Sequence, residues 1–374
     1  TDTLGTDTPL TLDCGESLSN FVLSYQTYGT LNAAKDNAIL ICHALSGDQY
    51  AASQNPAIDP PRPGWWETMI GPDRPINTNN YFVICSNVLG GCMGSTGPSS
   101  VNHDTGKIWG ADFPVITIGD MVAAQERLVT FLGIDRLHAV VGGSMGGMQS
   151  LEWMRRFPER LCGVVALATS YRQGVQGIAF HEAGRQAIMN DPAWNGGAYQ
   201  ELGTFPVNGL AVARMVAHVT YLSEKKLSER FGRQLSGRNF KSYSNSCDFQ
   251  IQSYLHHQGF SFTKRFDPNT YLYVTRAIDY FNQAEEYGDN LDEAYLEALD
   301  RYKPPVCLIS VSSDWTYPPS ESSRIETALR HAGVSVRHRI IESDDGHDAF
   351  LLPNNDIEGD MRYFLSHVIK ASHS

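Results

Sequence analysis

The sequence predicts an α/β fold in which a mostly parallel sheet is covered by helices on both faces and interrupted by a long helical insertion. Three observations predict it. Strand and helix patterns alternate as far as about residue 170, helical patterns prevail over 171–298, and strand patterns return near residue 305. Such alternation is typical of parallel sheets covered on both faces. We therefore expect residues 1–170 and 300–374 to form a core domain and residues 171–299 to form a helical lid over the site.

The individual elements follow from apolar periodicity and turn residues. The expected strands are short apolar runs bounded by turn chemistry, the first of them an edge strand: 21–28, 37–42, 81–85, 137–141, 161–168, 305–311 and 334–341. The expected helices have apolar residues at helical spacing: 120–132, 148–157, 178–189, 209–222, 253–262, 269–282 and 356–369.

Composition excludes several classes of function. The chain has 374 residues, 42% of them hydrophobic, and a formal net charge of -12. A chain of this length can bury a large core. The acidic excess argues against nucleic acid or an anionic membrane surface as the main partner. A phosphorylated small molecule stays open as a ligand, because local charge decides that.

The seven cysteines are scattered along the chain. Several lie in apolar runs, and no paired spacing suggests a zinc site or a disulfide framework. No stretch resembles a signal peptide, and no apolar run approaches the length of a membrane span. We expect buried, reduced thiols in a cytoplasmic protein with neither a metal site nor a membrane association.

The strand at 137–141 runs into the motif Gly142-x-Ser144-x-Gly146, and a helical run follows. Strand, sharp turn and helix are the context in which this motif is a nucleophile elbow. The turn strains the backbone of the serine, leaves little room for side chains two residues away, and places the hydroxyl near the positive end of the helix. We interpret Ser144 as a nucleophile; the alternative is a glycine-rich turn with an incidental serine.

The α/β-hydrolase fold supplies Ser, then Asp or Glu, then His, in chain order. Asp314 follows the strand at 305–311, and His347 lies in the loop after the last strand. His347 would activate Ser144, and Asp314 would orient the imidazolium. The acidic rivals of Asp314 stand too close to the histidine to follow a separate strand: Asp344, Asp345 and Asp348.

A nucleophile of this kind needs two backbone N–H groups to stabilise an oxyanion. Met145, directly after the nucleophile, supplies one. The loop 43–47 after an early strand supplies the other, and we choose Leu45 as its donor; the alternative is that this loop is a simple turn. The glycine-rich loop 90–97 invites a phosphate-cradle interpretation, but it lacks the Walker lysine spacing and is better interpreted as active-site wall.

Five blocks of the sequence, in the right order, resemble the homoserine O-acetyltransferase family, which consists of acyl-CoA-dependent enzymes with the α/β-hydrolase fold. The resemblance covers nearly the whole chain, including residues 178–182 of the insertion. The five blocks are 43–48, 87–100, 110–117, 142–149 and 346–350.

The resemblance implies a ping-pong acyl transfer in methionine biosynthesis. Ser144 would take the acetyl group from acetyl-CoA and release the thiol, and His347 would then deprotonate the hydroxyl of homoserine. The resemblance also implies no tightly bound cofactor, acetyl-CoA being the acyl-donor substrate, and a homodimer formed through the helical insertion.

Two substrate residues also follow from the resemblance. Arg214 would hold the carboxylate of homoserine and Asp348 its ammonium. An arginine within an apolar helix is costly unless it is paired, and a bidentate carboxylate suits it. The alternatives are an internal salt bridge or a surface position for Arg214, and a loop-capping role for Asp348. Tyr221, on the same helix, is a further candidate for the active-site wall.

The choice of acyl donor depends on one position. Succinyl-using relatives resemble Ser-Asp-Trp-Arg at the acid motif, where this chain has threonine at Thr316. Threonine cannot neutralise the extra carboxylate of a succinyl donor, so acetyl is favoured. The open alternatives are a homoserine O-succinyltransferase, a serine O-acyltransferase, an esterase, thioesterase or amidase on the same fold, and an inactive binding protein, against which the intact triad argues.

Overall fold

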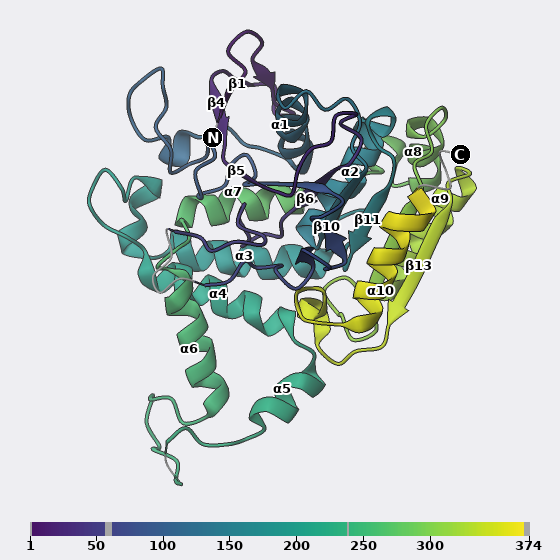
Figure 1. Ribbon diagram of the computed structural model, residues 1–374. Coiled ribbons are helices and arrows are strands. Elements are labelled where there is room, and N and C mark those ends of the chain that lie inside the picture. Colours follow the sequence, from purple (N-terminus) through teal and green to yellow (C-terminus); the bar gives the residue numbers. More distant parts are fainter. Residues whose placement is uncertain (1, 57–61, 238, 370–374) are drawn as a thin grey trace.

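The computed structural model describes residues 2–56, 62–237 and 239–369. Residues 1, 57–61 and 370–374 of the expected core domain and residue 238 of the expected lid lie outside them. Within the described residues, a seven-stranded sheet has the order β13-β12-β11-β10-β6-β9-β5 (Figure 1). Neighbouring strands are parallel except at one edge, where β5 pairs antiparallel with β9. The predicted fold class is confirmed. The strands of this sheet are β5 (Tyr25–Tyr28), β6 (Ala38–Cys42), β9 (Phe82–Ser86), β10 (Ala139–Gly143), β11 (Val164–Leu167), β12 (Val306–Val311) and β13 (Val336–Ile341).

The remaining strands are short and form two-stranded pairs outside the central sheet. They are β1 (Asp2–Leu4) with β4 (Phe21–Leu23), β2 (Leu10–Thr11) with β3 (Ser17–Leu18), and β7 (Ile70–Gly71) with β8 (Ile76–Asn77). The single edge strand expected over 21–28 is therefore wrong: it is divided at Ser24 into β4 and β5. The reason is that Ser24 bonds to a distant loop, its N–H donating to Ser95 Oγ (3.0 Å) and its carbonyl accepting from Asn87 N–H (2.8 Å).

Ten α-helices lie within the described residues, and each begins where the sequence offers a cap or a turn. Thr117 illustrates this, since its hydroxyl accepts from the N–H of Asp120 while the Asp120 side chain accepts from the N–H of Thr117. The helices are α1 (Ile118–Phe131), α2 (Met145–Arg156), α3 (Val175–Met189), α4 (Val207–Tyr221), α5 (Glu224–Phe231), α6 (Gln250–Phe262), α7 (Pro268–Asp279), α8 (Leu291–Ala298), α9 (Pro319–His331) and α10 (Asn355–Tyr363), the last continued by a π-helical turn at Phe364–Val368.

Both faces of the sheet are buried, because successive side chains of a strand point to opposite faces. Leu40 and Val140 pack toward α1, α2 and α9, whereas Ile39, Ile41 and Val141 pack toward α10 and the turn that follows it. This two-sided burial explains why the central strands read as continuous apolar runs.

Between β11 and β12 the described residues form helices and no strand of the central sheet. A small core of their own joins α3, α4, α6 and α7. In Figure 1, α3, α4 and α7 run beside one end of the sheet, while α5 and α6 extend away from the body of the molecule. The residues of that core are Ile188, Leu210, Ala213, Phe262, Phe266 and Tyr271.

All seven cysteines are free thiols. Cys42, Cys85 and Cys307 are buried as expected, and burial raises the pKa of each of these thiols. Cys14 differs from the expectation, since it is exposed on the turn between β2 and β3.

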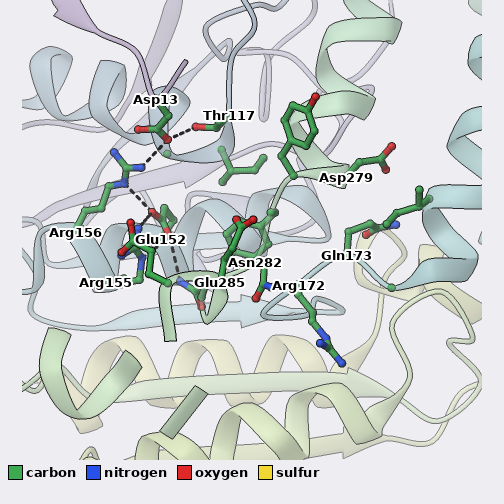
Figure 2. A pocket seen from close by; sticks show the side chains of 18 of the residues that line it. Asp13, Thr117, Glu152, Arg155, Arg156, Arg172, Gln173, Asp279, Asn282 and Glu285 are labelled. Atoms are coloured by element: carbon green, nitrogen blue, oxygen red, sulfur yellow. Dashed lines mark hydrogen bonds and ion pairs between the residues drawn. The ribbon is translucent and has the colours of Figure 1, made fainter. Parts of the chain in front are cut away.

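A buried carboxylate fixes the end of α2, the helix that follows the nucleophile motif (Figure 2). Glu152, with its side chain 4% exposed, lies 2.7 Å from Arg155 Nη2 and 2.7 Å from Arg156 Nε. Gln283 Nε2 also donates to it at 3.2 Å. Arg156 continues the network to Asp13 at 2.8 Å. The network therefore connects α2 with the N-terminal segment and with the segment after α7.

We expect Glu152→Gln to lower the free energy of unfolding by about 2 kcal/mol, because both arginines lose their buried carboxylate. Urea titration measures this, and Glu159→Gln is the matched control, since Glu159 is exposed and forms no ion pair within the described residues. Burial raises the pKa of Glu152, but the two arginines outweigh it and hold that pKa below its usual range. The difference between variant and wild type should therefore persist above pH ~4.3 and shrink as the pH falls through the lowered pKa. Equal stability of the two variants at pH 7 would contradict this account.

Candidate active site

Ser144 lies at the sharp turn between β10 and α2. Its backbone has φ 57° and ψ -125°, a strained conformation for a residue other than glycine. The turn is held from β11 and the residues after it: Ser144 N–H donates to the Leu167 carbonyl at 2.9 Å, and Thr169 Oγ1 donates to the Ser144 carbonyl at 2.8 Å. The predicted strand–turn–helix geometry of the elbow is present.

The two glycines of the motif are required by close backbone contacts. A Cβ added at Gly142 would overlap the carbonyl of Gly146, and one added at Gly146 would overlap the carbonyl of Cys42 at the end of β6. Because no side chain separates them, α2 begins directly against the end of β6, where the loop 43–47 starts.

The structure brings the three predicted triad residues into one hydrogen-bonded chain. His347 Nε2 lies 2.8 Å from Ser144 Oγ, and His347 Nδ1 lies 2.7 Å from Asp314 Oδ2. The other oxygen of Asp314 accepts from the N–H groups of Thr316 (2.9 Å) and Tyr317 (3.0 Å). Since both of its oxygens are bonded, the Asp314 carboxylate has a fixed orientation and fixes the histidine ring in turn.

The electrostatics of the site suit a histidine that gains a proton during a reaction. Burial lowers the pKa of His347, but the carboxylates of Asp314 and Asp348 outweigh burial and raise that pKa above its usual value. Burial also raises the pKa of Asp348, against the opposing charges of His347 and Arg214. Asp314 thus stabilises the imidazolium form of the ring that stands next to the serine hydroxyl.

The two expected oxyanion donors belong to the segments that meet at the serine, namely the start of α2 and the loop after β6. Met145 is the first residue of α2, where the N–H has no acceptor within the helix. Leu45 lines the same cavity as Ser144 and His347. An oxyanion hole requires two N–H groups that face the attacked carbonyl, and Leu45 and Met145 remain the predicted donors.

Sequence reasoning missed the residues that hold the oxyanion loop. The buried amide of Gln149 donates to the carbonyls of both His43 (3.1 Å) and Met145 (3.3 Å), so one side chain connects the two halves of the expected oxyanion hole. His43 Nε2 accepts from Val88 N–H at 3.1 Å, and its Nδ1–H donates to the Ala44 carbonyl at 2.8 Å. Burial lowers the pKa of His43, which keeps this ring neutral.

Arg214 has no carboxylate partner among the described residues. Its guanidinium lies over the ring of Phe262 at 4.6 Å and reaches the hydroxyls of Tyr221 (3.2 Å) and Ser46 (3.4 Å). The internal salt bridge considered for Arg214 is therefore absent from the described part of the chain. The half-buried Asp348 likewise forms no hydrogen bond or ion pair there. Within the described residues, the site thus contains a cation with no carboxylate partner and, beside His347, a carboxylate with no hydrogen bond or ion pair.

A cavity of about 260 Å³ opens beside the triad. Ser144 and His347 line it at one end, and its other walls come from the start of α3, the end of α4 and the loop after β12. Tyr221 and Thr316 are both in its wall, and the Thr316 hydroxyl donates to the Thr220 carbonyl at 2.9 Å. Arg172 also lines the cavity and is ion-paired with Asp289 at 3.3 Å.

A larger hollow of about 750 Å³ lies next to this cavity and shares the wall formed by 172–175 (Figure 2). It contains no triad residue. Its arginines Arg155 and Arg156 are already bound to carboxylates, and Glu285 and Glu286 add negative charge to the lining. This chemistry does not suit a catalytic role, so the candidate active site is the smaller cavity.

Neither a metal site nor a membrane helix stands out in the described residues. No three or more His, Cys, Asp or Glu side chains gather there as metal ligands would, and no helix there is long and apolar enough to cross a membrane.

Comparison with known proteins shows what the chain is similar to. The model of the alpha/beta hydrolase fold matches residues 37–353. A homoserine O-acetyltransferase of Mesorhizobium japonicum is 53% identical over 98% of this chain and 93% of its own length. The crystal structure of homoserine O-acetyltransferase from Bacillus anthracis has a TM-score of 0.86 and 28% identity over 96% of this chain and 95% of its own. The structure of esterase E22 is similarly close, with a TM-score of 0.85 and 30% identity over 96% and 97%.

We expect Gly146→Ala to lower the activity of the site by at least about 100-fold. The Cβ of the alanine would overlap the Cys42 carbonyl and force α2 away from β6. The control is Gly359→Ala in α10, where an added Cβ meets nothing within 4 Å. That change should raise the free energy of unfolding by about 0.5–1 kcal/mol. Esterase activity toward p-nitrophenyl acetate and thermal unfolding measure the two effects. Full activity of Gly146→Ala would show that the close contact does not determine the geometry of the site.

Proposed function

The chain belongs to the homoserine O-acetyltransferase family of the α/β-hydrolase fold, and from this premise we propose that it transfers an acetyl group from acetyl-CoA to the side-chain hydroxyl of L-homoserine, as a step of methionine biosynthesis. The observation that carries the proposal is the pair of opposite charges, Arg214 and Asp348, beside a serine triad, since neither forms an ion pair within the described residues. An amino-acid acceptor presents the two complementary charges.

The first half-reaction acetylates the serine. His347 Nε2 takes the proton of Ser144 Oγ, which attacks the thioester carbonyl of acetyl-CoA. The N–H groups of Leu45 and Met145 stabilise the oxyanion, while Asp314 stabilises the imidazolium. When the intermediate collapses, the carbon–sulfur bond breaks and His347 returns the proton to the leaving thiol. Acetyl-Ser144 and free CoA result.

The second half-reaction transfers the acetyl group. Arg214 binds the carboxylate of homoserine and Asp348 binds its ammonium, which orients the side-chain hydroxyl toward the acetyl-enzyme. His347 removes the hydroxyl proton, the oxygen attacks the ester carbonyl, and the proton returns to Ser144 Oγ as O-acetylhomoserine forms. Water lacks both charges, so the two ends of the amino acid favour it over water as the acceptor.

Acetyl is the proposed acyl group because no arginine stands at the position of Thr316. The Thr316 hydroxyl is committed to the Thr220 carbonyl, and Arg172 in the same cavity is committed to Asp289. A succinyl donor would need a cation for its extra carboxylate. These contacts favour the uncharged acetyl group.

The proposal also includes no tightly bound cofactor, a cytoplasmic location and a homodimer formed through the helical insertion. Exposed apolar side chains on α4 and α6 support the last of these, since Val212, Val219 and Phe260 are each more than 40% exposed there.

The second candidate is an esterase that releases acetyl groups to water. The structural similarity to esterase E22 favours it. The triad serves either reaction, so the fate of the acetyl-enzyme distinguishes the two.

We expect purified protein to release thiol from acetyl-CoA rapidly only when homoserine is present, with succinyl-CoA and serine as poor substitutes. Ser144→Ala is the control and should show no release. Release that does not depend on homoserine would favour the thioesterase or esterase, and a preference for succinyl-CoA would show that Thr316 does not set the donor.

Arg214→Gln should raise the KM for homoserine by about 100-fold, roughly 3 kcal/mol, and leave acetylation of the serine unchanged.

The activity should be lost at low pH as His347 becomes protonated, with a midpoint above about 6.5 because Asp314 and Asp348 raise the pKa of the ring. Asp348→Asn removes one of these carboxylates, so the midpoint of the low-pH loss of activity (the acid limb of the pH profile) should move to lower pH in this variant. The measurement is acetylation by p-nitrophenyl acetate, which does not need the homoserine-binding role of Asp348. A limb that stays in place or moves to higher pH would contradict the electrostatic account of His347.

A further inference from the structure

A second histidine–aspartate pair stands at the active-site cavity, where the histidine lines the wall and the aspartate lies behind it, in the lining of the larger hollow. His181 of α3 is in the cavity wall, with its side chain 18% exposed. Its Nδ1 lies 2.7 Å from Asp279 Oδ1 at the end of α7. The proposed acyl transfer uses His347 and Asp314 and assigns nothing to this pair.

Buried ionic contacts hold His181 in one orientation. The Asp279 side chain is 4% exposed and lies 2.6 Å from Arg185 Nη1, which is itself 3% exposed. Arg185 also pairs with Glu182 at 2.9 Å. Figure 2 shows Asp279 extending away from the cluster of Glu152 and its arginines. The Asp279 carboxylate therefore contacts two residues of α3, Arg185 and His181, and fixes the histidine ring.

The contact with Asp279 occupies Nδ1 of His181 and leaves Nε2 for a ligand. In the tautomer whose Nδ1–H donates to this carboxylate, Nε2 is the acceptor of the ring. Nε2 forms no hydrogen bond in the described part of the chain, and it is not one of the buried polar atoms there that lack a partner. A donor N–H within the cavity would complete its hydrogen bonding.

The place of His181 limits what that ligand is. A thioester must put its carbonyl at Ser144, so the part of the donor next to the sulfur fills the cavity behind it. In CoA this part is the pantetheine arm, which carries two amide N–H groups. At about 260 Å³, the cavity is below the usual range of roughly 300–1,000 Å³ for small-molecule sites, and suits the arm better than the nucleotide.

We propose that His181, oriented by Asp279 and Arg185, accepts a hydrogen bond from an amide of the pantetheine arm and so positions the acyl-CoA donor. This inference rests on the proposed function and deepens it. His181 contacts the donor away from the reacting atoms. It should therefore affect acetyl-CoA and leave acetyl donors without the arm unaffected.

The test compares kcat/KM for acetyl-CoA and for p-nitrophenyl acetate, which has no arm, in the full-length protein. His181→Asn is the informative variant, because the asparagine amide replaces Nδ1 as the donor to Asp279 while Nε2 is removed. We expect about a tenfold lower kcat/KM for acetyl-CoA, equivalent to ~1.4 kcal/mol, mainly through KM, and no change for p-nitrophenyl acetate. His181→Gln places an amide near the position of Nε2 and should recover part of the loss.

His256→Asn is the matched control, since His256 is exposed on α6 outside the cavity; it should match wild type with both donors. Equal losses for both donors in His181→Asn would overturn the inference, because they would indicate a role in folding or in the shared chemistry. An unchanged kcat/KM for acetyl-CoA would overturn it as well. Failure of the proposed function gives a different result: wild-type protein would then use p-nitrophenyl acetate and not acetyl-CoA.

Discussion

The direct contact between the start of α2 and the end of β6 is the constraint on which the site depends. No side chain fits between Gly146 and the carbonyl of Cys42. The nucleophile on one segment therefore stands beside the loop that begins at His43 on the other. Gln149 bonds the carbonyls of His43 and Met145, which keeps the two segments at one separation. The strain at Ser144 is compensated by this packing and by the bonds from Leu167 and Thr169.

The parts of the structure that depend on local pattern could be predicted from the sequence. Gly-x-Ser-x-Gly between a strand and a helix predicted the elbow, because its close backbone contacts leave no room for a Cβ at Gly142 or Gly146. Asp314 and His347 could be selected because the fold puts each of them after a late strand, and the structure joins them to Ser144. Because both faces of the sheet are buried, its strands could be recognised in the sequence as short apolar runs.

The parts that depend on distant contacts could not be predicted. Nothing near Gln149 indicates which carbonyls its amide reaches. Nothing near His181 indicates its partner either, because Asp279 lies 98 residues away in the sequence. The edge strand was expected to be continuous over 21–28. The loop that divides it at Ser24 lies some seventy residues further along the chain, so the local pattern carries no sign of the division. Arg214 was placed by resemblance, and only the structure shows that the described residues offer it no carboxylate.

The central claim is that the acetyl-enzyme waits for an amino acid, because Arg214 and Asp348 recognise both of its charged ends. Intact-protein mass spectrometry after mixing with acetyl-CoA tests this most directly. We predict an acetyl adduct on Ser144 that persists in buffer, disappears within one turnover after homoserine is added, and does not form in Ser144→Ala. An adduct that decays in buffer as fast as it does with homoserine would contradict the account and identify a hydrolase.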